Sequence, residues 1–291
     1  MTACDTRSRR QVCRYVPWVA MLLSPRTTLA VATTALALSV PPIGEPAWGE
    51  TAPVPQGSGQ AGAPSGGPPS APAPSEEAAP RTVLLSDERV LSRWAHPARL
   101  ADIYRYPSAE SSKVGRLRFF TEDGFPEVYL LLRERTDARE RQWVQIRIPK
   151  RPNGRVGWVP RDALGPYNVN RFQLVVDRST LRAKLFKRGA TVWSARIGVG
   201  ASSTKTPAGR FWVREKLRFK NTPVYGTRAI GTSAYAPTLS DWPNGGVIGI
   251  HGTDQPQLIP GRPSHGCIRV KNPDIARLWR IIPLGTPVLI R

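Results

Sequence analysis

The chain has 291 residues, which exceeds the usual span of one domain and predicts two compact domains together with non-globular sequence. Hydrophobic residues make up 40% and charged residues 22%, and no apolar run reaches the length of about 18 residues that a membrane-spanning helix requires. A polytopic membrane protein is therefore excluded. The 30 Pro and 25 Gly residues argue against an all-helical bundle.

Basic residues outnumber acidic residues by 42 to 21, and most of the surplus lies in residues 166–291. A basic surface attracts nucleic acid, anionic lipid and anionic cell-wall polymer alike, because the field of many Lys and Arg residues does not discriminate among polyanions. The charge therefore selects no partner. Because single Arg residues are scattered along this region, a solvated basic face is the simplest interpretation.

The N-terminal segment has the order of a secretory signal. Basic residues precede an apolar stretch over 29–40, which is followed by the small-residue triplet 47–49. We expect residues 1–49 to be a signal peptide cleaved after that triplet, or an uncleaved membrane anchor, with translation starting at Met1 or Met21. The expected location is the periplasm or cell envelope, with membrane contact only through this segment.

Cysteine usage agrees with export. Cys4 and Cys13 precede the expected cleavage point, so the mature protein would keep only Cys267 and could form no intramolecular disulfide. A lone thiol in an oxidising compartment is more often explained by chemistry or by deep burial than by chance.

Two segments of different character follow. Residues 50–82 are rich in Pro, Gly and Ala and offer few aliphatic side chains to bury, so we expect a flexible linker. In residues 83–166, turn signals separate short segments typical of β-strands, which predicts a small antiparallel barrel. The expected strands are 102–105, 114–119, 128–133, 143–148 and 156–159.

This block resembles a bacterial SH3-like domain. The resemblance depends on size, strand order and the segment Gly157-Trp158-Val159 near the end of the last expected strand. Such modules often bind cell-wall peptides, and a role as a structural spacer stays open.

Residues 170–291 are also strand-rich, so the fold class is mainly β. Apolar residues alternate from Phe172 to Val176, and residues 286–290 are expected to form the closing strand. One short helix is expected, with Asn272 as its N-cap and Pro283 ending it. Its apolar stripe comprises Ile275, Leu278, Trp279 and Ile282.

Scarce reactive residues gather near the C-terminus: two of the three His residues, His251 and His265, lie close to Cys267. A thiol is a weak nucleophile until a base or cation stands beside it. His251 and Cys267 could face each other across neighbouring strands as a thiolate–imidazolium pair. The amides of Gly266 and Cys267 could then stabilise an oxyanion. His265 could be the base instead, because spacing alone does not decide.

The strings His251-Gly252-Thr253 and Ser264-His265-Gly266-Cys267-Ile268-Arg269 resemble the signature of the L,D-transpeptidase catalytic domain, the YkuD-like family. The segments 206–211 and 284–288 are similar to an upstream turn and to the C-terminal end of that family. Together these motifs cover residues 170–291.

The resemblance implies an enzyme whose Cys attacks the peptide bond between the third and fourth residues of a peptidoglycan stem and releases D-Ala. The acyl group then passes to an amine, on another stem or on an envelope protein. By position, Cys267 is the nucleophile and His251 the general base. Gly252, at a place where some relatives have Ser, would orient His251 through its carbonyl. Such an enzyme would serve cell-wall organisation and cell shape.

The same resemblance assigns the remaining site residues. His265 and Gly266 would frame the pocket and its oxyanion site, while Arg269 and Ser264 would contact substrate. Tyr235 and Trp242 lie where relatives build a lid, and they are expected to bind substrate as well. Neither cofactor nor metal is expected, and no nucleic-acid partner.

Three other functions stay open. Water could replace the amine acceptor, which gives L,D-carboxypeptidase activity, or the protein could bind the cell wall without catalysis. The imidazoles of His251 and His265 with the Cys267 thiolate could also hold zinc, although a fourth ligand is missing nearby.

Overall fold

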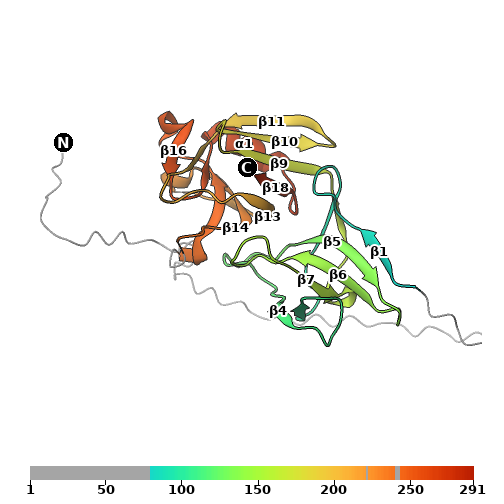
Figure 1. Ribbon diagram of the computed structural model, residues 1–291. Helices are drawn as coiled ribbons and strands as arrows, with labels where there is room; N and C mark the ends of the chain where they lie inside the picture. Colours follow the sequence, from blue (N-terminus) through green and yellow to red (C-terminus); the bar gives the residue numbers. More distant parts are fainter. Residues whose placement is uncertain (1–78, 221, 240–242) are drawn as a thin grey trace, which may run out of the picture. The chain divides into compact units, whose positions relative to one another are not determined.

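The computed structural model describes residues 79–220, 222–239 and 243–291, and these form two β-sheets with a single α-helix (Figure 1). The expected signal or anchor, residues 1–49, and most of the expected linker, 50–82, lie outside the described residues. Of the residues that are described, all fall within one compact unit.

The first sheet is antiparallel throughout and has the strand order β4-β3-β7-β6-β5-β2-β8, with β1 pairing beside β5. Its strands are β1 (Arg81–Leu84), β2 (Ser92–Ala95), β3 (Asp102–Tyr104), β4 (Lys113–Arg116), β5 (Tyr129–Thr136), β6 (Gln142–Arg147), β7 (Val156–Pro160) and β8 (Asn168–Asn170). A short 3-10 helix, η1 (Arg161–Ala163), follows β7.

Alternation of side chains explains the core of this sheet. Tyr129 and Leu131 on β5 point to the same side as Val144 and Ile146 on β6, and all four are buried. The β5–β6 hairpin turns at Asp137, whose Oδ1 accepts the backbone N–H groups of residues 139 and 141.

All five strands expected in this region are present. The sheet also contains β1, β2 and β8, which the sequence pattern did not indicate, because short strands of mixed polarity carry little alternation. The pairing of the described strands runs along one path from β4 to β8, and the SH3-like identity of this domain stays a prediction.

The second sheet has ten strands in the order β11-β10-β9-β18-β13-β14-β15-β17-β12-β16. Its strands are β9 (Phe172–Asp177), β10 (Arg182–Lys187), β11 (Ala190–Arg196), β12 (Gly198–Gly200), β13 (Gly209–Arg218), β14 (Arg228–Tyr235), β15 (Val247–His251), β16 (Gly261–Ser264), β17 (Ile268–Arg269) and β18 (Pro287–Ile290). The 3-10 helices η2 (Pro223–Tyr225), η3 (Pro243–Gly246) and η4 (Pro256–Leu258) lie in its connections.

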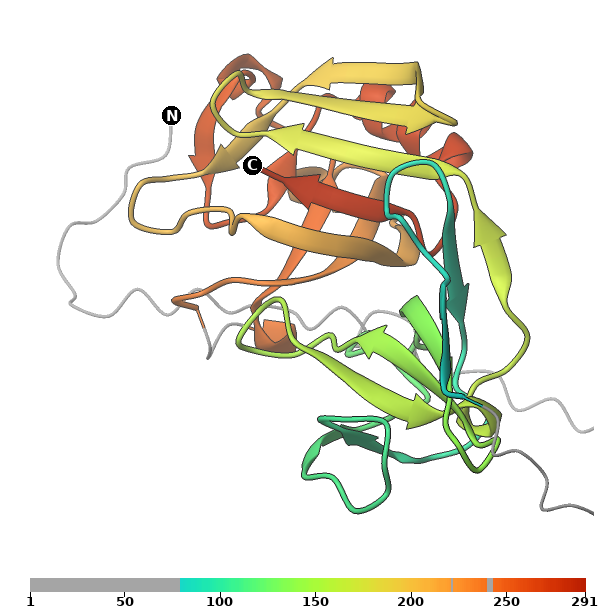
Figure 2. The ribbon, with the colours of Figure 1, turned by 45° about the vertical axis from the view of Figure 1, so that its right-hand side comes forward.

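The closing strand β18 lies between β9 and β13, parallel to β9 and antiparallel to β13 (dark red in Figure 2). The C-terminus therefore completes the middle of the sheet. On the other side of β14, strand β15 pairs in parallel with β17, which places the residues that follow Gly266 next to the end of β15.

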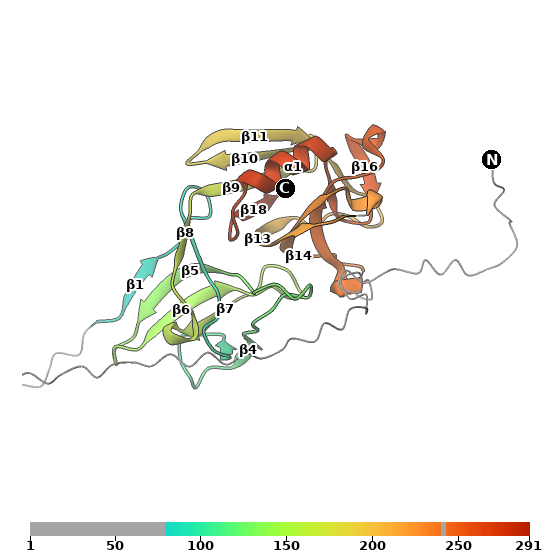
Figure 3. The same ribbon diagram turned by 180° about the vertical axis from the view of Figure 1, so that it is seen from behind.

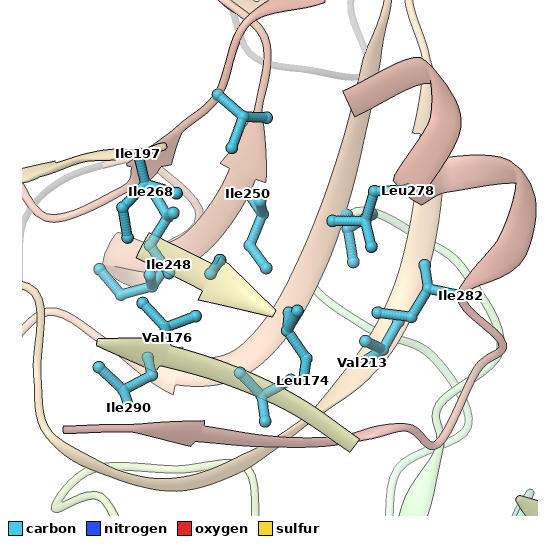
Figure 4. Packing of buried hydrophobic residues seen from close by; sticks show 14 of the residues in the cluster. Leu174, Val176, Ile197, Val213, Ile248, Ile250, Ile268, Leu278, Ile282 and Ile290 are labelled. Carbon is cyan, nitrogen blue, oxygen red and sulfur yellow. The ribbon is translucent and has the colours of Figure 1, made fainter. Parts of the chain in front are cut away.

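The helix α1 (Asn272–Ile281) packs on β14 and β15. Figure 3 shows the helix on the near side of the second sheet. Its buried Leu278 shares an interior with Leu174 of β9 and Ile250 of β15, among the side chains drawn in Figure 4. Pro283 follows the C-cap Ile282, so the predicted end of the helix is confirmed.

The predicted start of α1 is wrong by one residue. Lys271 is the N-cap, and it makes no side-chain capping hydrogen bond. Asn272 lies inside the first turn, and its Oδ1 accepts the backbone N–H of Thr253 at 2.9 Å. The amide that was expected to cap the helix therefore joins the helix start to the loop that follows His251.

Charged and apolar contacts join the two sheets. Arg214 of β13 is fully buried, and its Nε donates to Glu127 Oε1 at 2.7 Å while its Nη2 donates to Glu122 Oε2 at 3.0 Å. Trp212 Nε1 donates to the carbonyl of Val128 at 2.7 Å. A buried ion pair needs full hydrogen bonding to offset its desolvation, and these contacts supply much of it.

Candidate active site

A pocket at the ends of β15, β16 and β17 brings together the reactive residues that the sequence singled out. His251 ends β15, and Cys267 directly precedes β17. The pocket is lined by Val224, Tyr225, Ala236, Leu239, Gly246, Val247, Ile248, His251, Ser264, His265, Cys267 and Arg269. The imidazole thus lies at the end of β15 and the thiol in the turn before β17, and these two strands pair directly.

His251 is buried and has a defined tautomer. Its Nδ1 lies 2.6 Å from the carbonyl oxygen of Gly252, and because a carbonyl only accepts, Nδ1 carries the hydrogen. The Nε2 atom is then an acceptor. The ring also makes an edge contact with Tyr225, with 4.9 Å between centroids. Burial lowers the pKa of His251 to about 4, so the imidazole is neutral at neutral pH.

Cys267 lies in the same pocket, where the backbone N–H of Gly249 donates to its sulfur at 3.5 Å. Burial raises the pKa of the Cys267 thiol. Burial therefore opposes the thiolate–imidazolium pair that the sequence suggested. Both charged forms lose hydration in the pocket, so a neutral thiol and a neutral imidazole are favoured.

The turn before the thiol is held by side-chain hydrogen bonds. Ser264 Oγ donates to the carbonyl of Cys267 at 2.6 Å and accepts the N–H of Gly266 at 3.1 Å. Thr206 Oγ1 donates to the carbonyl of Gly266 at 2.7 Å. Gly266 has φ +127°, and a Cβ there would lie 2.9 Å from Ile248 Cδ1. Only glycine fits this conformation without strain.

These contacts correct one expectation. The Gly266 amide was expected to be available for an oxyanion, but it already donates to Ser264 Oγ. Ser264 is buried, and both of its hydrogen bonds lie within the turn, so its side chain positions the backbone at Cys267.

His265 and Arg269 line the pocket on either side of Cys267 in the sequence. His265 is exposed at the pocket, in contrast with the buried His251. Arg269 donates from Nη1 to Gln255 Oε1 at 3.3 Å. Its Nε is buried and has no hydrogen-bond partner among the described residues. A guanidinium that lines the pocket suits an anionic group of a ligand.

Tyr235 and Trp242 were expected in a lid over the pocket, and the structure describes only Tyr235. The side chain of Tyr235 lies in the contact between the sheets, where its hydroxyl hydrogen-bonds to Glu122 and, at 3.1 Å, to the carbonyl of Pro149. The residue after it, Ala236, lines the pocket instead. Trp242 lies outside the described residues.

Sequence reasoning missed Asn272 as a site residue. A Cβ at Gly252 would come 2.1 Å from Asn272 Oδ1, so glycine at position 252 makes room for the amide that accepts from Thr253. Gly252 in turn supplies the carbonyl that holds His251. A polar residue at the start of a helix was visible in the sequence, but its partner 19 residues away was not.

Within the described residues, no group of three or more His, Cys, Asp and Glu side chains is arranged to hold a metal ion. Likewise, none of the helices found in that part of the chain has the length and apolar character needed to cross a membrane.

Comparison with known proteins identifies the class of this domain. Residues 171–290 match the YkuD family, described as the L,D-transpeptidase catalytic domain. Residues 171–290 thus match a YkuD-like catalytic domain, in agreement with the sequence motif around Cys267.

Individual relatives bear names of the same kind. Over 125 residues the chain is 37% identical to YkuD of Bacillus subtilis, which is named as an L,D-transpeptidase; the match covers 43% of this chain and 66% of that one. ErfK/SrfK of Salmonella typhimurium, also named as an L,D-transpeptidase, is 33% identical over 45% of this chain and 48% of its own length. The chain therefore spans about half to two thirds of the length of these relatives.

Among solved structures, the catalytic domain of an Enterococcus faecium L,D-transpeptidase is 26% identical, with a TM-score of 0.31. The match covers 41% of this chain and 95% of that domain.

Proposed function

We propose that the C-terminal domain is a cysteine-dependent L,D-transpeptidase that acts on tetrapeptide stems of peptidoglycan. The observation that supports this proposal most is the pairing of His251 Nδ1 with the Gly252 carbonyl in the pocket that contains Cys267. This hydrogen bond leaves Nε2 as the basic atom, and a base near a thiol is what acyl transfer requires.

In the first step, Cys267 Sγ attacks the carbonyl carbon of the third residue of the stem, in the peptide bond to the fourth residue. The thiol proton passes to His251 Nε2. The tetrahedral oxyanion collapses, the C–N bond breaks, and the proton moves from His251 to the leaving amine of D-Ala. A thioester remains on Cys267. Because thiol and imidazole are both neutral at rest, proton transfer accompanies attack.

In the second step, the amine of an acceptor attacks the thioester carbonyl, and His251 takes the amine proton. The C–S bond breaks, the new amide leaves, and the proton returns to Cys267. The acceptor is a second stem or an envelope protein. Water in place of the amine would give the L,D-carboxypeptidase reaction.

Arg269 is proposed to bind a carboxylate of the stem, because its cationic side chain lines the pocket beside Cys267. With the Gly266 amide engaged by Ser264, the amide of Cys267 is the proposed donor to the oxyanion. His265, exposed at the pocket, frames the entrance.

The rest of the chain fits an envelope enzyme. We propose that residues 1–49 direct export or anchor the protein, that residues 50–82 tether it, and that the N-terminal sheet is an SH3-like domain. The basic surplus of the catalytic region suits an anionic wall polymer. Neither a metal nor a soluble cofactor is required by this chemistry.

Intact-protein mass spectrometry tests the proposal. With a tetrapeptide stem, the wild-type protein should gain the mass of the stem less the mass of the released D-Ala, and a carbapenem should add covalently. Cys267→Ala should show neither adduct, and His251→Gln should show much slower acylation. His265→Gln is the matched control and should acylate. An adduct on the Cys267→Ala protein would refute the assignment.

The products separate the remaining candidates. A cross-linked or amine-joined product indicates transpeptidation, whereas a tripeptide alone indicates carboxypeptidase activity. Wall binding without any turnover would favour a non-enzymatic role. Stoichiometric zinc that is lost in Cys267→Ala would favour a metal site.

A further inference from the structure

Arg151, in the turn between β6 and β7, contacts the backbone that forms one wall of the catalytic pocket. Its Nε and Nη2 donate to the carbonyl of Ala236 at 3.0 and 2.8 Å, and Nη2 also donates to the carbonyl of Leu239 at 3.2 Å. Ala236 and Leu239 line the pocket together with Cys267. The guanidinium of the N-terminal domain thus lies directly behind the pocket wall.

The wall is shaped to accept this guanidinium. Gly246, another pocket residue, has φ +68°, and its carbonyl accepts the N–H of Ala236 at 2.8 Å. A Cβ at position 246 would lie 2.8 Å from Arg151 Nη2 and 2.4 Å from the carbonyl oxygen of Leu239. Any side chain at position 246 would therefore push the guanidinium or the wall out of place.

Asn153 holds Tyr235, the first residue of the segment 235–239 that forms the wall. Its Nδ2 donates to the carbonyl of Tyr235 at 2.8 Å, and its Oδ1 accepts the N–H of Tyr235 at 3.0 Å. One amide side chain thus pairs with both backbone groups of the last residue of β14. Arg151 adds a cation–π contact, with its Cζ 5.2 Å from the centre of the Tyr235 ring.

Arg151 and Asn153, both in the turn between β6 and β7, contact the same segment, residues 235–239. Residues 235–239 leave β14 and form the wall, and five hydrogen bonds from Arg151 and Asn153 hold three of these residues. A forked guanidinium on two carbonyls defines both position and orientation, which a single point charge does not. Substrate that lies against this wall is thereby held at a defined distance from the thiol.

We propose that Arg151 and Asn153 are positioning residues of the catalytic site: they fix the wall formed by residues 235–239, against which the donor stem binds. This inference rests on the proposed function. The N-terminal domain then serves as part of the catalytic unit and not only as a spacer. Neither residue lines the pocket, so each acts through the wall.

The experiment compares Arg151→Ala, Arg151→Lys and Asn153→Ala with the matched control Arg155→Ala. Arg155 lies near the same turn, but its Nη2 donates to the carbonyl of Val114 inside the N-terminal domain. Two rates are measured on each protein: acylation of Cys267 by the tetrapeptide stem, and alkylation of Cys267 by iodoacetamide, which is too small to need the wall.

We expect Arg151→Ala and Asn153→Ala to lower kcat/KM for acylation roughly tenfold or more, chiefly through KM, with alkylation by iodoacetamide unchanged. Arg151→Lys should recover part of the loss, because an ammonium can reach one carbonyl but cannot form the fork. Arg155→Ala should match the wild type in both rates. Wild-type acylation by Arg151→Lys and Asn153→Ala would overturn the inference, even if Arg151→Ala failed to fold.

Hydrogen exchange separates this inference from the proposed function. If the wild-type protein does not acylate at all, the proposed function fails, and the inference is judged on the amides of residues 235, 236, 238 and 239. Faster exchange there in the Arg151 and Asn153 variants, but not in Arg155→Ala, supports the positioning role. Unchanged exchange in all variants contradicts it.

Discussion

At the residue scale, His251 combines burial with a single strong hydrogen bond. The Gly252 carbonyl fixes the tautomer, while burial penalises the imidazolium form and lowers the pKa. A base with a low pKa stays unprotonated over a wide range of pH. It accepts a proton from a thiol only as that thiol attacks, which protects the enzyme from unproductive ionisation.

The pH profile of acylation should reflect this environment. Because the pKa of His251 is lowered to about 4, the base is available above that pH, and kcat/KM should fall on the acid side near pH 4 instead of near the ordinary value of 6.5. Stopped-flow or discontinuous acylation assays at a series of acidic pH values measure this fall in kcat/KM. His265→Gln should not change the pH at which kcat/KM falls. A fall near pH 6.5 in the wild type would contradict the argument that burial lowers the pKa of His251.

Asn272 should matter for rate although it is not in the motif. Asn272→Ala removes the acceptor for the N–H of Thr253 and so loosens the loop whose Gly252 carbonyl holds His251. The loss of one such hydrogen bond, about 1 kcal/mol, predicts a fall in kcat of roughly fivefold. Steady-state assays test this, with exposed Arg277→Ala on the same helix as the control. An equal fall in both variants would indicate a general effect on α1.

The motif residues were visible in the sequence because the chemistry needs their types, and scarce His and Cys residues stand out. Their supports were not visible. Asn272 was interpreted as a helix cap, since capping residues and residues of the first turn differ by one position. The Gly266 amide was expected to be available, because nothing along the chain shows that Ser264 turns back to accept it.

At the element scale, both faces of β13 are buried, one against apolar side chains and the other against charged ones. Phe211 and Val213 belong to the core of the second sheet, whereas Trp212 and Arg214 contact residues of the first sheet. Glu215 also contacts the first sheet, because the register of β13 shifts between Val213 and Glu215. Strand alternation predicts such two-faced strands, but it cannot say that the polar face is covered.

Glu215 should make stability depend on pH. Burial, and next the charge of Asp123, raise the pKa of Glu215 to about 8. The folded protein therefore binds a proton that the unfolded chain has lost above its ordinary pKa of 4.5. The stabilising effect is complete below that ordinary value and is lost as pH rises toward 8, by at most about 1.4 kcal/mol per pH unit.

Urea unfolding at a series of pH values measures this dependence. Glu215→Gln keeps an acceptor for Thr121 but cannot ionise, so its free energy of unfolding should fall less than that of the wild type from about pH 5 to about pH 8. The exposed Glu110→Gln is the control and should follow the wild type. Parallel curves for Glu215→Gln and the wild type would contradict the assignment.

Local pattern predicted the elements with strong periodicity, and α1 and β18 are where the sequence placed them within one residue. The strands β1, β2 and β8 were missed, because each has only three or four residues and owes its conformation to partners elsewhere in the chain. The parallel pairing of β15 with β17 was expected only as adjacency, since side-chain pattern does not encode strand direction.

At the scale of the whole molecule, the two sheets share buried polar groups that neither could satisfy alone. Arg214 has its carboxylate partners, Glu122 and Glu127, in the N-terminal domain, and Trp212 has its acceptor at Val128. A sequence divided at about residue 168 shows two separate domains. It does not show that each domain lacks partners for its own interior groups.

Removal of the N-terminal sheet should therefore destabilise the catalytic domain. A fragment of residues 168–291 would lose the partners of Arg214 and Trp212 and would expose the apolar Trp212 ring to water. We expect its Tm to be roughly 10 °C below that of residues 79–291, and its acylation to be slower because Arg151 and Asn153 are absent.

Calorimetry and acylation assays on both fragments test this expectation. Residues 79–291 should unfold in one cooperative transition, because each sheet is stabilised by its contacts with the other. Trp212→Phe, which keeps an aromatic ring but loses the hydrogen bond to Val128, should lower that single Tm by a smaller amount. Two well-separated transitions, or a short fragment as stable and as active as the long one, would show that the sheets are independent and that the buried Arg214 finds other partners.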